Sequence, residues 1–195
     1  MEAIVLGIVR HNDKASVLRA YTRAHGRVNY MVYGRRKQAG QFAPLSVVEL
    51  IASGKEDTIY TDSIRTLKES SLIYVPQRLQ NDIMRQSVAM FIAEVLSSLL
   101  VHPLGDEAMF DFLLATIRDL DTTDDVANVH LRFLRSLCVQ LGIAIDAGEH
   151  PELLCEVHTR VERQRMLQAL CFYIEQQIDG FRSPKSLDVL TELFD

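Results

Sequence analysis

Residues 3–34 read AIVLGIVRHNDKASVLRAYTRAHGRVNYMVYG, and this stretch decides the fold class. It consists of short runs rich in Val, Ile and Tyr, which are separated by the turn-forming clusters His-Asn-Asp and His-Gly. Such punctuation is typical of β-strands joined by tight turns. Continued to residue 75, the pattern predicts five strands, at Ala3–Arg10, Ser16–Thr22, Arg27–Gly34, Leu45–Ala52 and Thr58–Leu67.

Five strands within 75 residues leave no room for crossover helices. A closed or nearly closed barrel is then the economical way to cover the strand edges, which would otherwise expose unpaired backbone groups. The OB-fold is the best-known barrel of five strands. We therefore predict an OB-fold β-barrel over residues 1–75.

After Pro76 the apolar residues recur every three or four positions instead of every two, as Met84, Val88, Phe91 and Val95 show. This spacing predicts helices, and hence an α-helical domain over residues 76–195. The fold class is therefore α+β, with the barrel followed by the helical domain. The expected helices run from Leu79 to about Leu99, from Asp106 to Leu120, from Thr122 to Leu141 and onward from Val157, with a last short helix after Ser183.

Several residues in the helical part mark expected helix ends. Thr122 followed by Asp125 resembles a capping box that opens the third helix, and Gly142 stands where that helix would be capped. The periodicity fails between Gly142 and Glu156, so this segment is predicted to be a loop.

Composition excludes several protein classes. The chain has 195 residues, of which 48% are apolar and 24% charged, so it is neither disordered nor of low complexity. Its net charge of −5 argues against a uniformly basic nucleic-acid coat. The charge is uneven, however: residues 1–75 carry 11 Lys and Arg against 7 Asp and Glu, and the rest of the chain is acidic.

No motif in the chain supports catalysis or cofactor binding. No Gly-rich phosphate loop, Gly-x-Ser-x-Gly or His-Glu-x-x-His sequence is present, so we expect neither an enzyme nor a cofactor. Cys155-x-x-His158 lacks the paired Cys-x-x-Cys spacing of structural zinc, and Cys138 and Cys171 fall on apolar helix faces, so we expect no metal. The 14-residue apolar stretch 88–101 is too short to cross a bilayer, and no signal peptide is evident; we expect a cytoplasmic protein.

The beginning of the barrel is strongly basic. Eight cations stand within the first 37 residues against only two carboxylates. They are Arg10, Lys14, Arg19, Arg23, Arg27, Arg35, Arg36 and Lys37. Tyr21, Tyr30 and Tyr33 are interleaved with them, and aromatic rings among cations are what single-stranded nucleic acid requires, since bases stack on the rings while cations follow the phosphates. The alternative is that the tyrosines belong to the barrel wall and the arginines to a solvated face.

The order of several short motifs resembles the RecO family of recombination mediators, in a form without zinc. The motifs of the barrel are Ala3-Ile-Val-Leu, Tyr21-Thr22, Gly26-Arg27-Val28 and Gly34-Arg35-Arg36-Lys37. The ending Ser183-Pro-Lys-Ser186 with Leu187, and the helical stretches 90–100 and 128–133, are similar as well. The resemblance covers most of the chain.

The resemblance implies a non-enzymatic mediator of DNA repair. Such a protein would bind single- and double-stranded DNA without sequence preference, anneal complementary strands, and help load RecA together with RecR on DNA coated by single-strand binding protein. The residues that we expect to contact DNA are Arg10, Arg19, Arg27, Tyr33, Arg35, Arg36 and Lys37. The acidic, apolar tail of single-strand binding protein would need an apolar pocket with a cationic rim, for which the candidates are Arg132, Arg135, Arg163 and Arg165.

Two departures from the family and one competing function remain open. Many members carry a four-cysteine zinc module that this chain lacks, and the segment between Gly142 and Glu156 is shorter than expected: either it is reduced or residues are missing from the chain. The four helical-domain arginines could also simply pair with neighbouring carboxylates. The competing hypothesis is a protein-interaction adaptor whose barrel contacts DNA only incidentally.

Overall fold

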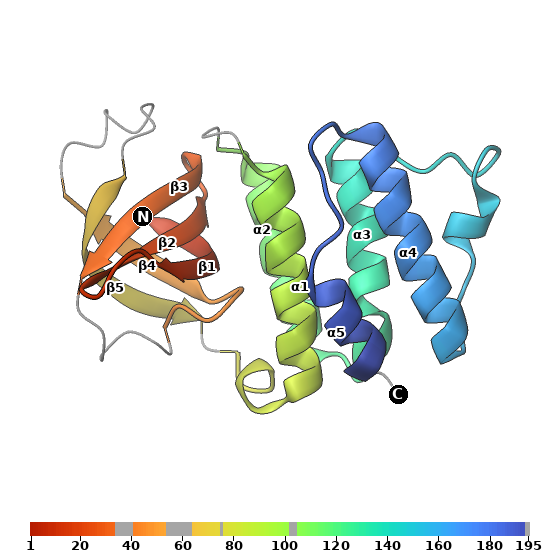
Figure 1. Cartoon of the computed structure of the whole chain (residues 1–195), viewed down its shortest axis with the longest axis horizontal. Coiled ribbons are helices and arrows are strands. Elements are labelled where there is room, and N and C mark those ends of the chain that lie inside the picture. The colour runs from red at the N-terminus through yellow and green to blue at the C-terminus, as the bar shows by residue number, and fades with distance from the viewer. Residues whose placement is uncertain (34–40, 54–63, 75, 102–104, 194–195) are drawn as a thin grey trace. The chain divides into compact units, whose positions relative to one another are not determined.

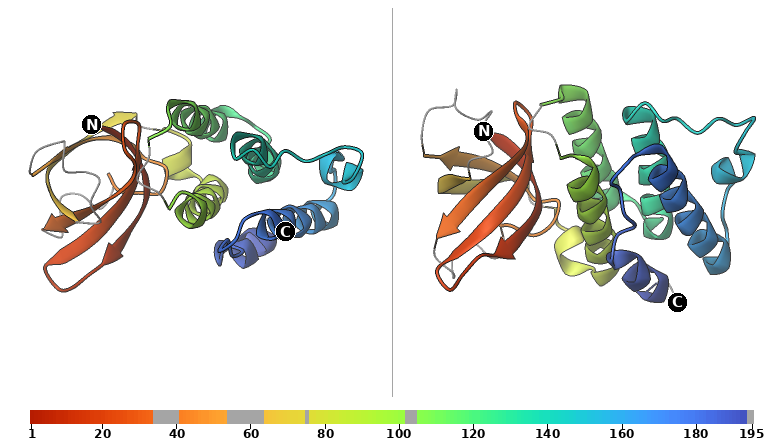
Figure 2. Two further views of the ribbon diagram at one scale, coloured as in Figure 1. Left: turned by 90° about the horizontal axis from the view of Figure 1, so that it is seen from above. Right: turned by 45° about the horizontal axis from the view of Figure 1, so that its top comes forward.

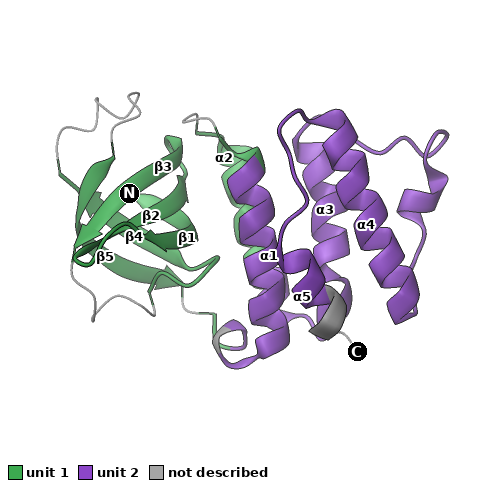
Figure 3. Ribbon diagram, viewed as in Figure 1, with its two compact units in different colours: residues 1–77, 99–118 green, residues 78–98, 119–195 purple. Residues whose placement is uncertain are grey.

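The computed structural model describes residues 1–33, 41–53, 64–74, 76–101 and 105–193. The chain divides into two compact units, which Figure 3 distinguishes by colour. The barrel unit comprises residues 1–77 and 99–118, and the helical unit comprises residues 78–98 and 119–195. Residues 99–118, which the sequence boundary at residue 75 assigns to the helical domain, thus belong to the compact barrel unit.

The barrel is closed, with the strand order β1-β2-β3-β5-β4 (Figures 1 and 2). Its strands are β1 (Glu2–Arg10), β2 (Ala15–Thr22), β3 (Gly26–Tyr33), β4 (Val47–Ala52) and β5 (Arg65–Tyr74). All neighbouring pairs are antiparallel except β3 and β5, which run parallel. The five-stranded barrel that the sequence predicts is confirmed.

The predicted position of the last strand is wrong. β5 begins at Arg65, so only three residues of the predicted strand Thr58–Leu67 belong to it. The sequence misled because the polar residues 68–71 interrupt the apolar pattern, whereas in the barrel only Leu67 and Leu72 of this strand face the core. Segment 58–63 lies outside the described residues.

The barrel core is built from alternate residues of every strand. Leu18 and Ala20 of β2 pack with Val28, Tyr30 and Val32 of β3, and all five are at least 90% buried. Burial raises the pKa of Tyr30 to about 12, so its hydroxyl stays protonated inside the barrel. Tyr30 is therefore a core residue and not a stacking platform.

Helix α2 (Glu107–Thr122) begins in the barrel unit. Phe110 stacks on Tyr21 of β2 with 6.3 Å between ring centroids, and both rings are buried. Arg23 lies over the same Phe110 ring at 4.4 Å and forms ion pairs with Glu2 and Asp111. These contacts explain why the first turns of α2 group with the barrel.

Among the described residues, the helical unit contains four further α-helices (Figure 1). They are α1 (Ile83–Leu99), α3 (Val129–Gln140), α4 (Arg160–Gln177) and α5 (Ser186–Leu193). The predicted start of the third helix is wrong: Thr122 is the last residue of α2, and α3 begins at Val129 after a short 3-10 turn. None of the described helices is long and apolar enough to cross a membrane.

The other helix boundaries follow local hydrogen bonding. Gly142, at φ 74°, ends α3: its N–H donates to the carbonyl oxygen of Val139, and that of Ile143 donates to Cys138, as the sequence predicts for a glycine cap. The last helix starts at Ser186, later than the predicted cap at Ser183, because the Ser186 N–H and hydroxyl both donate to the carboxylate of Glu94 on α1.

Candidate nucleic-acid interface on the barrel

The outward side of β1, β2 and β3, here called the outer face, follows from the pairing register. Because Leu18, Ala20, Val28 and Tyr30 point into the core, the residues between them point outward. The register aligns these outward residues in rows across the strands, namely Met31–Val17–Val9, Asn29–Arg19–Gly7 and Arg27–Tyr21–Ile4, with Tyr33 opposite Ala15 beyond the first row.

Two arginines form the positive part of this face. Arg19 of β2 pairs in register with Asn29, one row from Arg27 of β3, so the two guanidinium groups are neighbours. Burial, followed by repulsion from Arg19, lowers the pKa of Arg27. Within the described part of the chain, no carboxylate forms an ion pair with Arg19. A cation without such neutralisation, held beside a second cation, favours an anionic ligand.

Gly7 keeps the outer face open beside Arg19. It stands at a β-bulge in β1, where the register shifts between Val5 and Gly7, and its φ of 155° is one that residues with a side chain rarely adopt. The residue opposite Arg19 therefore contributes no side chain, and no atom lies within 4 Å of where a Cβ would be. A ligand can approach the backbone there.

The row next to Arg19 is apolar. Val9, Val17 and Met31 lie side by side on three strands, and we call them the apolar row. Val9 is 46% exposed, and Tyr33 beyond the row is 61% exposed. Tyr33 is the one barrel tyrosine in the described residues of β2 and β3 whose ring is open to solvent, since Tyr21 and Tyr30 are buried.

The other end of the outer face is covered. Tyr21, in the row of Arg27, lies beneath Phe110, and Arg23 is held by two carboxylates and this ring. Arg23 therefore contributes to the basic count of the sequence but is neutralised in the structure. Its pKa is raised by hydrogen bonds to Asp111 and Glu2, which stabilise the charged form.

The structure separates the predicted DNA-contact residues. It brings Arg19, Arg27 and Tyr33 onto one face, but Arg10 pairs with Ser16 on the opposite side of the sheet and forms an ion pair with Asp13. The basic loop residues Arg35, Arg36 and Lys37 lie outside the described residues. Sequence reasoning missed Val9, Val17, Asn29 and Met31, although their period-two alternation with core residues marked them as outward.

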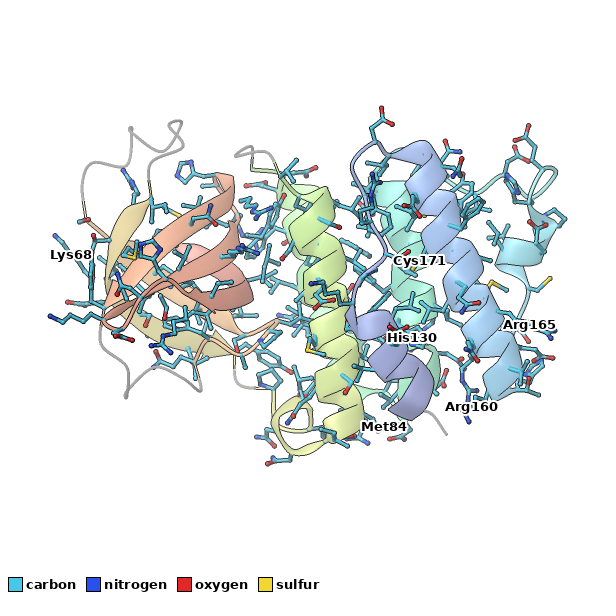
Figure 4. The ribbon with its side chains drawn as sticks, viewed as in Figure 1. Lys68, Met84, His130, Arg160, Arg165 and Cys171 are labelled. Carbon is cyan, nitrogen blue, oxygen red and sulfur yellow. The ribbon has the colours of Figure 1, made fainter. Side chains whose placement is uncertain are left out.

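The helical-unit arginines have different surroundings. Arg132 forms ion pairs with Asp119 and Asp125, and Arg135 donates to the carbonyl oxygens of Leu153 and Cys155 at 2.8 and 2.7 Å. These two arginines hold neighbouring chain segments. Arg163 has a buried Nε with no hydrogen-bond partner, and Arg165 is exposed on α4, as Figure 4 shows. Arg132 and Arg135 are thus engaged within the protein. Of the four predicted rim residues, Arg163 and Arg165 have no such ion pair or carbonyl contact among the described residues.

The cysteines do not fit the zinc module of the family. Burial raises the pKa of Cys138 to about 11 and that of Cys171 to about 12, so both thiols are protonated in the metal-free protein, as is expected of buried structural cysteines. Cys155 is exposed in the loop before α4. In the described ranges, no three His, Cys, Asp or Glu side chains gather in a way that could hold a metal ion.

Comparison with known families matches both halves of the chain. The family model "Recombination protein O N terminal" matches residues 1–73, and "Recombination protein O C terminal" matches residues 80–150. The first match covers the five strands of the barrel. The second ends within the loop that precedes α4.

Curated relatives have the same family name. The chain is 26% identical to the DNA repair protein RecO of Flavobacterium johnsoniae, over 99% of this chain and 98% of that protein. It is 34% identical to the protein of the same name in Porphyromonas gingivalis, over 74% of this chain and 60% of that protein, and 26% identical to that of Bacteroides fragilis over 98% and 97%. The closed barrel, the helical unit and these matches together show that the chain belongs to the RecO family of DNA repair and recombination proteins.

Proposed function

We propose that this protein is a non-enzymatic recombination mediator that binds DNA without sequence preference through the outer face of its barrel. One observation carries the proposal: Arg19 and Arg27 are neighbours on a face that is open beside Gly7, and Arg19 has no carboxylate partner among the described residues. Phosphates would relieve the repulsion between the two cations. Contacts of this kind are to the backbone of DNA and carry no sequence information.

The family membership supports the rest of the mechanism. We infer that the protein anneals complementary strands and acts with RecR to load RecA on DNA coated by single-strand binding protein, in the cytoplasm at the nucleoid. Arg163 and Arg165 of the helical unit are the residues we propose for the acidic tail of single-strand binding protein. The barrel and the helical unit would then contact different partners.

The test is a salt titration of DNA binding. The double variant R19A/R27A should bind a 30-nucleotide oligo-dT about ten- to thirtyfold more weakly than the wild-type protein at about 0.1 M salt. The slope of log K against log salt should become shallower by about 1.4, because each phosphate contact on a single strand contributes about 0.7. Fluorescence anisotropy at several salt concentrations measures both quantities.

Lys68 of β5 provides the matched control, since it is an exposed cation of the same barrel outside the outer face (Figure 4). K68A should leave the slope close to that of the wild-type protein. If R19A/R27A behaves like K68A, the outer face is not the DNA surface. R35A/R36A/K37A tests the basic loop in the same titration, and strand annealing with and without single-strand binding protein separates a mediator from an adaptor, which does not anneal.

A further inference from the structure

The apolar row and the arginines lie next to each other on the outer face. Val17 follows Arg19 at the next outward position of β2, and Met31 follows Asn29 on β3, so the rows are about 7 Å apart. Val9 and Tyr33, whose side chains are exposed, extend this apolar surface. Val17 and Met31 are only partly buried, and Val9 and Tyr33 are exposed, so apolar surface stays open to solvent here, and phosphates have no attraction for it.

The two forms of DNA differ in what they offer to such a surface. In a duplex the base faces are stacked on one another, and the outside presents phosphates. A single strand presents phosphates and also base faces, which stack on aromatic rings and contact apolar side chains. The arginines suit either form, whereas Tyr33 and the apolar row suit only exposed bases.

We propose that the outer face is selective for single-stranded over double-stranded DNA, with phosphates at Arg19 and Arg27 and bases over Met31, Val17 and Tyr33. This inference rests on the proposed function, because it assumes that the same face binds DNA. In this proposal the two arginines contribute affinity for both single- and double-stranded DNA. The apolar row and Tyr33 contribute affinity for single-stranded DNA only. Duplex DNA that binds here gains from the cations alone.

The order of the cations and the apolar row favours a nucleic acid over an acidic, apolar peptide. A peptide of that kind places its carboxylates on the cations at irregular spacing, but Arg19 and Arg27 lie one row apart on neighbouring strands, within one strip that continues into the apolar row. A single strand has the same order, with phosphates on one side and bases on the other. The peptide remains an outcome that the experiment distinguishes.

The experiment compares two outer-face variants on two probes, using the full chain. M31S/Y33A and Y33F are measured against a 30-nucleotide oligo-dT and a 30-base-pair duplex of mixed sequence. M31S/Y33A should lose about tenfold or more in affinity for oligo-dT and less than about twofold for the duplex. Y33F, which keeps the ring, should bind oligo-dT within about twofold of the wild-type protein.

The outcomes distinguish a failure of the proposed selectivity from a failure of the proposed DNA binding. Equal losses on both probes, or no loss on oligo-dT, overturn the selectivity of the face while R19A/R27A still reports on DNA binding itself. If R19A/R27A binds both probes as the wild-type protein does, the proposed function fails instead. A ten-residue peptide of Asp and Phe that displaces oligo-dT from the wild-type protein more strongly than unlabelled oligo-dT overturns the assignment to DNA. Matching melting curves confirm that the variants fold.

Discussion

Arg19 and Arg10 show what a single residue's sequence position can and cannot predict. Both belong to the basic stretch of the sequence and both are arginines on strands. Arg19 faces outward without a carboxylate partner among the described residues, but Arg10 lies on the other side of the sheet and is neutralised by Asp13. The difference depends on the bulge near Gly7, which shifts the register by one residue, and a shift of that size is not evident from the residue types.

Gly105 gives a prediction at the scale of one residue. A Cβ at this position would lie 2.4 Å from the backbone carbon and oxygen of Ala24, and the backbone cannot yield as a flexible side chain can. We expect Gly105→Ala to lower the free energy of unfolding by about 1–3 kcal/mol, the usual effect of overpacking. Urea denaturation followed by circular dichroism measures the change.

Gly148→Ala is the matched control for Gly105→Ala. Its Cβ would lie 3.0 Å from Oδ1 of the exposed Asp146 side chain, which accepts hydrogen bonds from Gly148 and Glu149 but can shift by a few tenths of an ångström, so the expected change is smaller, below about 1 kcal/mol. Equal effects of the two substitutions would contradict the close approach between Gly105 and Ala24.

His130 predicts a pH dependence of stability. It is 2% exposed, and burial, together with repulsion from Arg163 and Arg132, lowers its pKa from 6.5 to about 4 in the folded protein. Between these values the unfolded chain binds a proton that the folded protein does not, so this contribution is present above pH 6.5 and is lost as the pH falls toward 4. It amounts to about 3 kcal/mol.

The measurement is urea denaturation of the wild-type protein and of His130→Gln at intervals between pH 4 and 7.5. Glutamine does not titrate in this range, so the variant should lose less stability than the wild-type protein between pH 6.5 and 4. Parallel curves for the two proteins would show that His130 does not titrate with a lowered pKa.

At the scale of an element, the end of α2 is held by an arginine that no sequence pattern indicated. The last carbonyl oxygens of a helix need donors from outside it. Arg85, which is 1% exposed on α1, donates to the carbonyl oxygens of Leu120 and Thr123 and pairs with Asp82. Nearby, the buried Asp121 accepts from the backbone N–H groups of Arg78 and Leu79. The sequence did not predict these hydrogen bonds, because apolar periodicity indicates which residues are buried and not which groups form hydrogen bonds.

Arg85→Met should lower the free energy of unfolding by about 3 kcal/mol, because it removes the side-chain donor of the buried Leu120 carbonyl oxygen and of the partly buried Thr123 carbonyl oxygen, and the charge that pairs with Asp82. Arg78→Met is the control: its guanidinium also donates to a carbonyl oxygen, that of Thr122, and pairs with Asp124, but its side chain is 50% exposed. The control should cost less than about 1 kcal/mol. Similar losses in chemical denaturation of both variants would contradict the importance of burial at Arg85.

The elements themselves could largely be predicted from the sequence, and the errors have a common cause. Strands β1 to β4 and the helical periods are evident because one face of each element is buried. The predicted boundaries are wrong where polar residues lie inside an element, as at residues 68–71 of β5. They are also wrong where a residue can either end one helix or cap the next, as at Thr122. Thr122 ends α2 rather than capping α3, and the choice depends on tertiary contacts such as those of Arg85 and Arg78.

At the scale of the whole molecule, the relatives are longer than this chain. The alignment with the protein of Flavobacterium johnsoniae has 235 positions over 99% of a 195-residue chain, so about forty positions have no residue here. The C-terminal family match ends at residue 150, within the loop that the sequence indicated to be short. In this chain the loop is held by Arg135 and by the Tyr173 hydroxyl, which donates to the carbonyl oxygen of Ile143.

The purified protein is expected to contain no stoichiometric zinc. No three His, Cys, Asp or Glu side chains gather as metal ligands in the described ranges, and the three cysteines lack the paired spacing of structural zinc, so stability should not depend on a metal. Elemental analysis should find less than about 0.1 zinc per chain, and the melting temperature should be unchanged by EDTA. One zinc per chain, or a lower melting temperature in EDTA, would contradict this prediction.

Phe110 covers Tyr21 at one end of the outer face, so under the proposed function only the rest of this face is open to a DNA strand. From Arg27, at the edge of the covered row, to Tyr33, β3 extends about 20 Å, a length that accommodates only a few nucleotides. A DNA strand bound as proposed would be held over so short a distance that its flanking bases stay available to a complementary strand. Weak binding of a few nucleotides would then allow the complementary strand to align. The protein would dissociate once base pairing extends beyond the bound nucleotides.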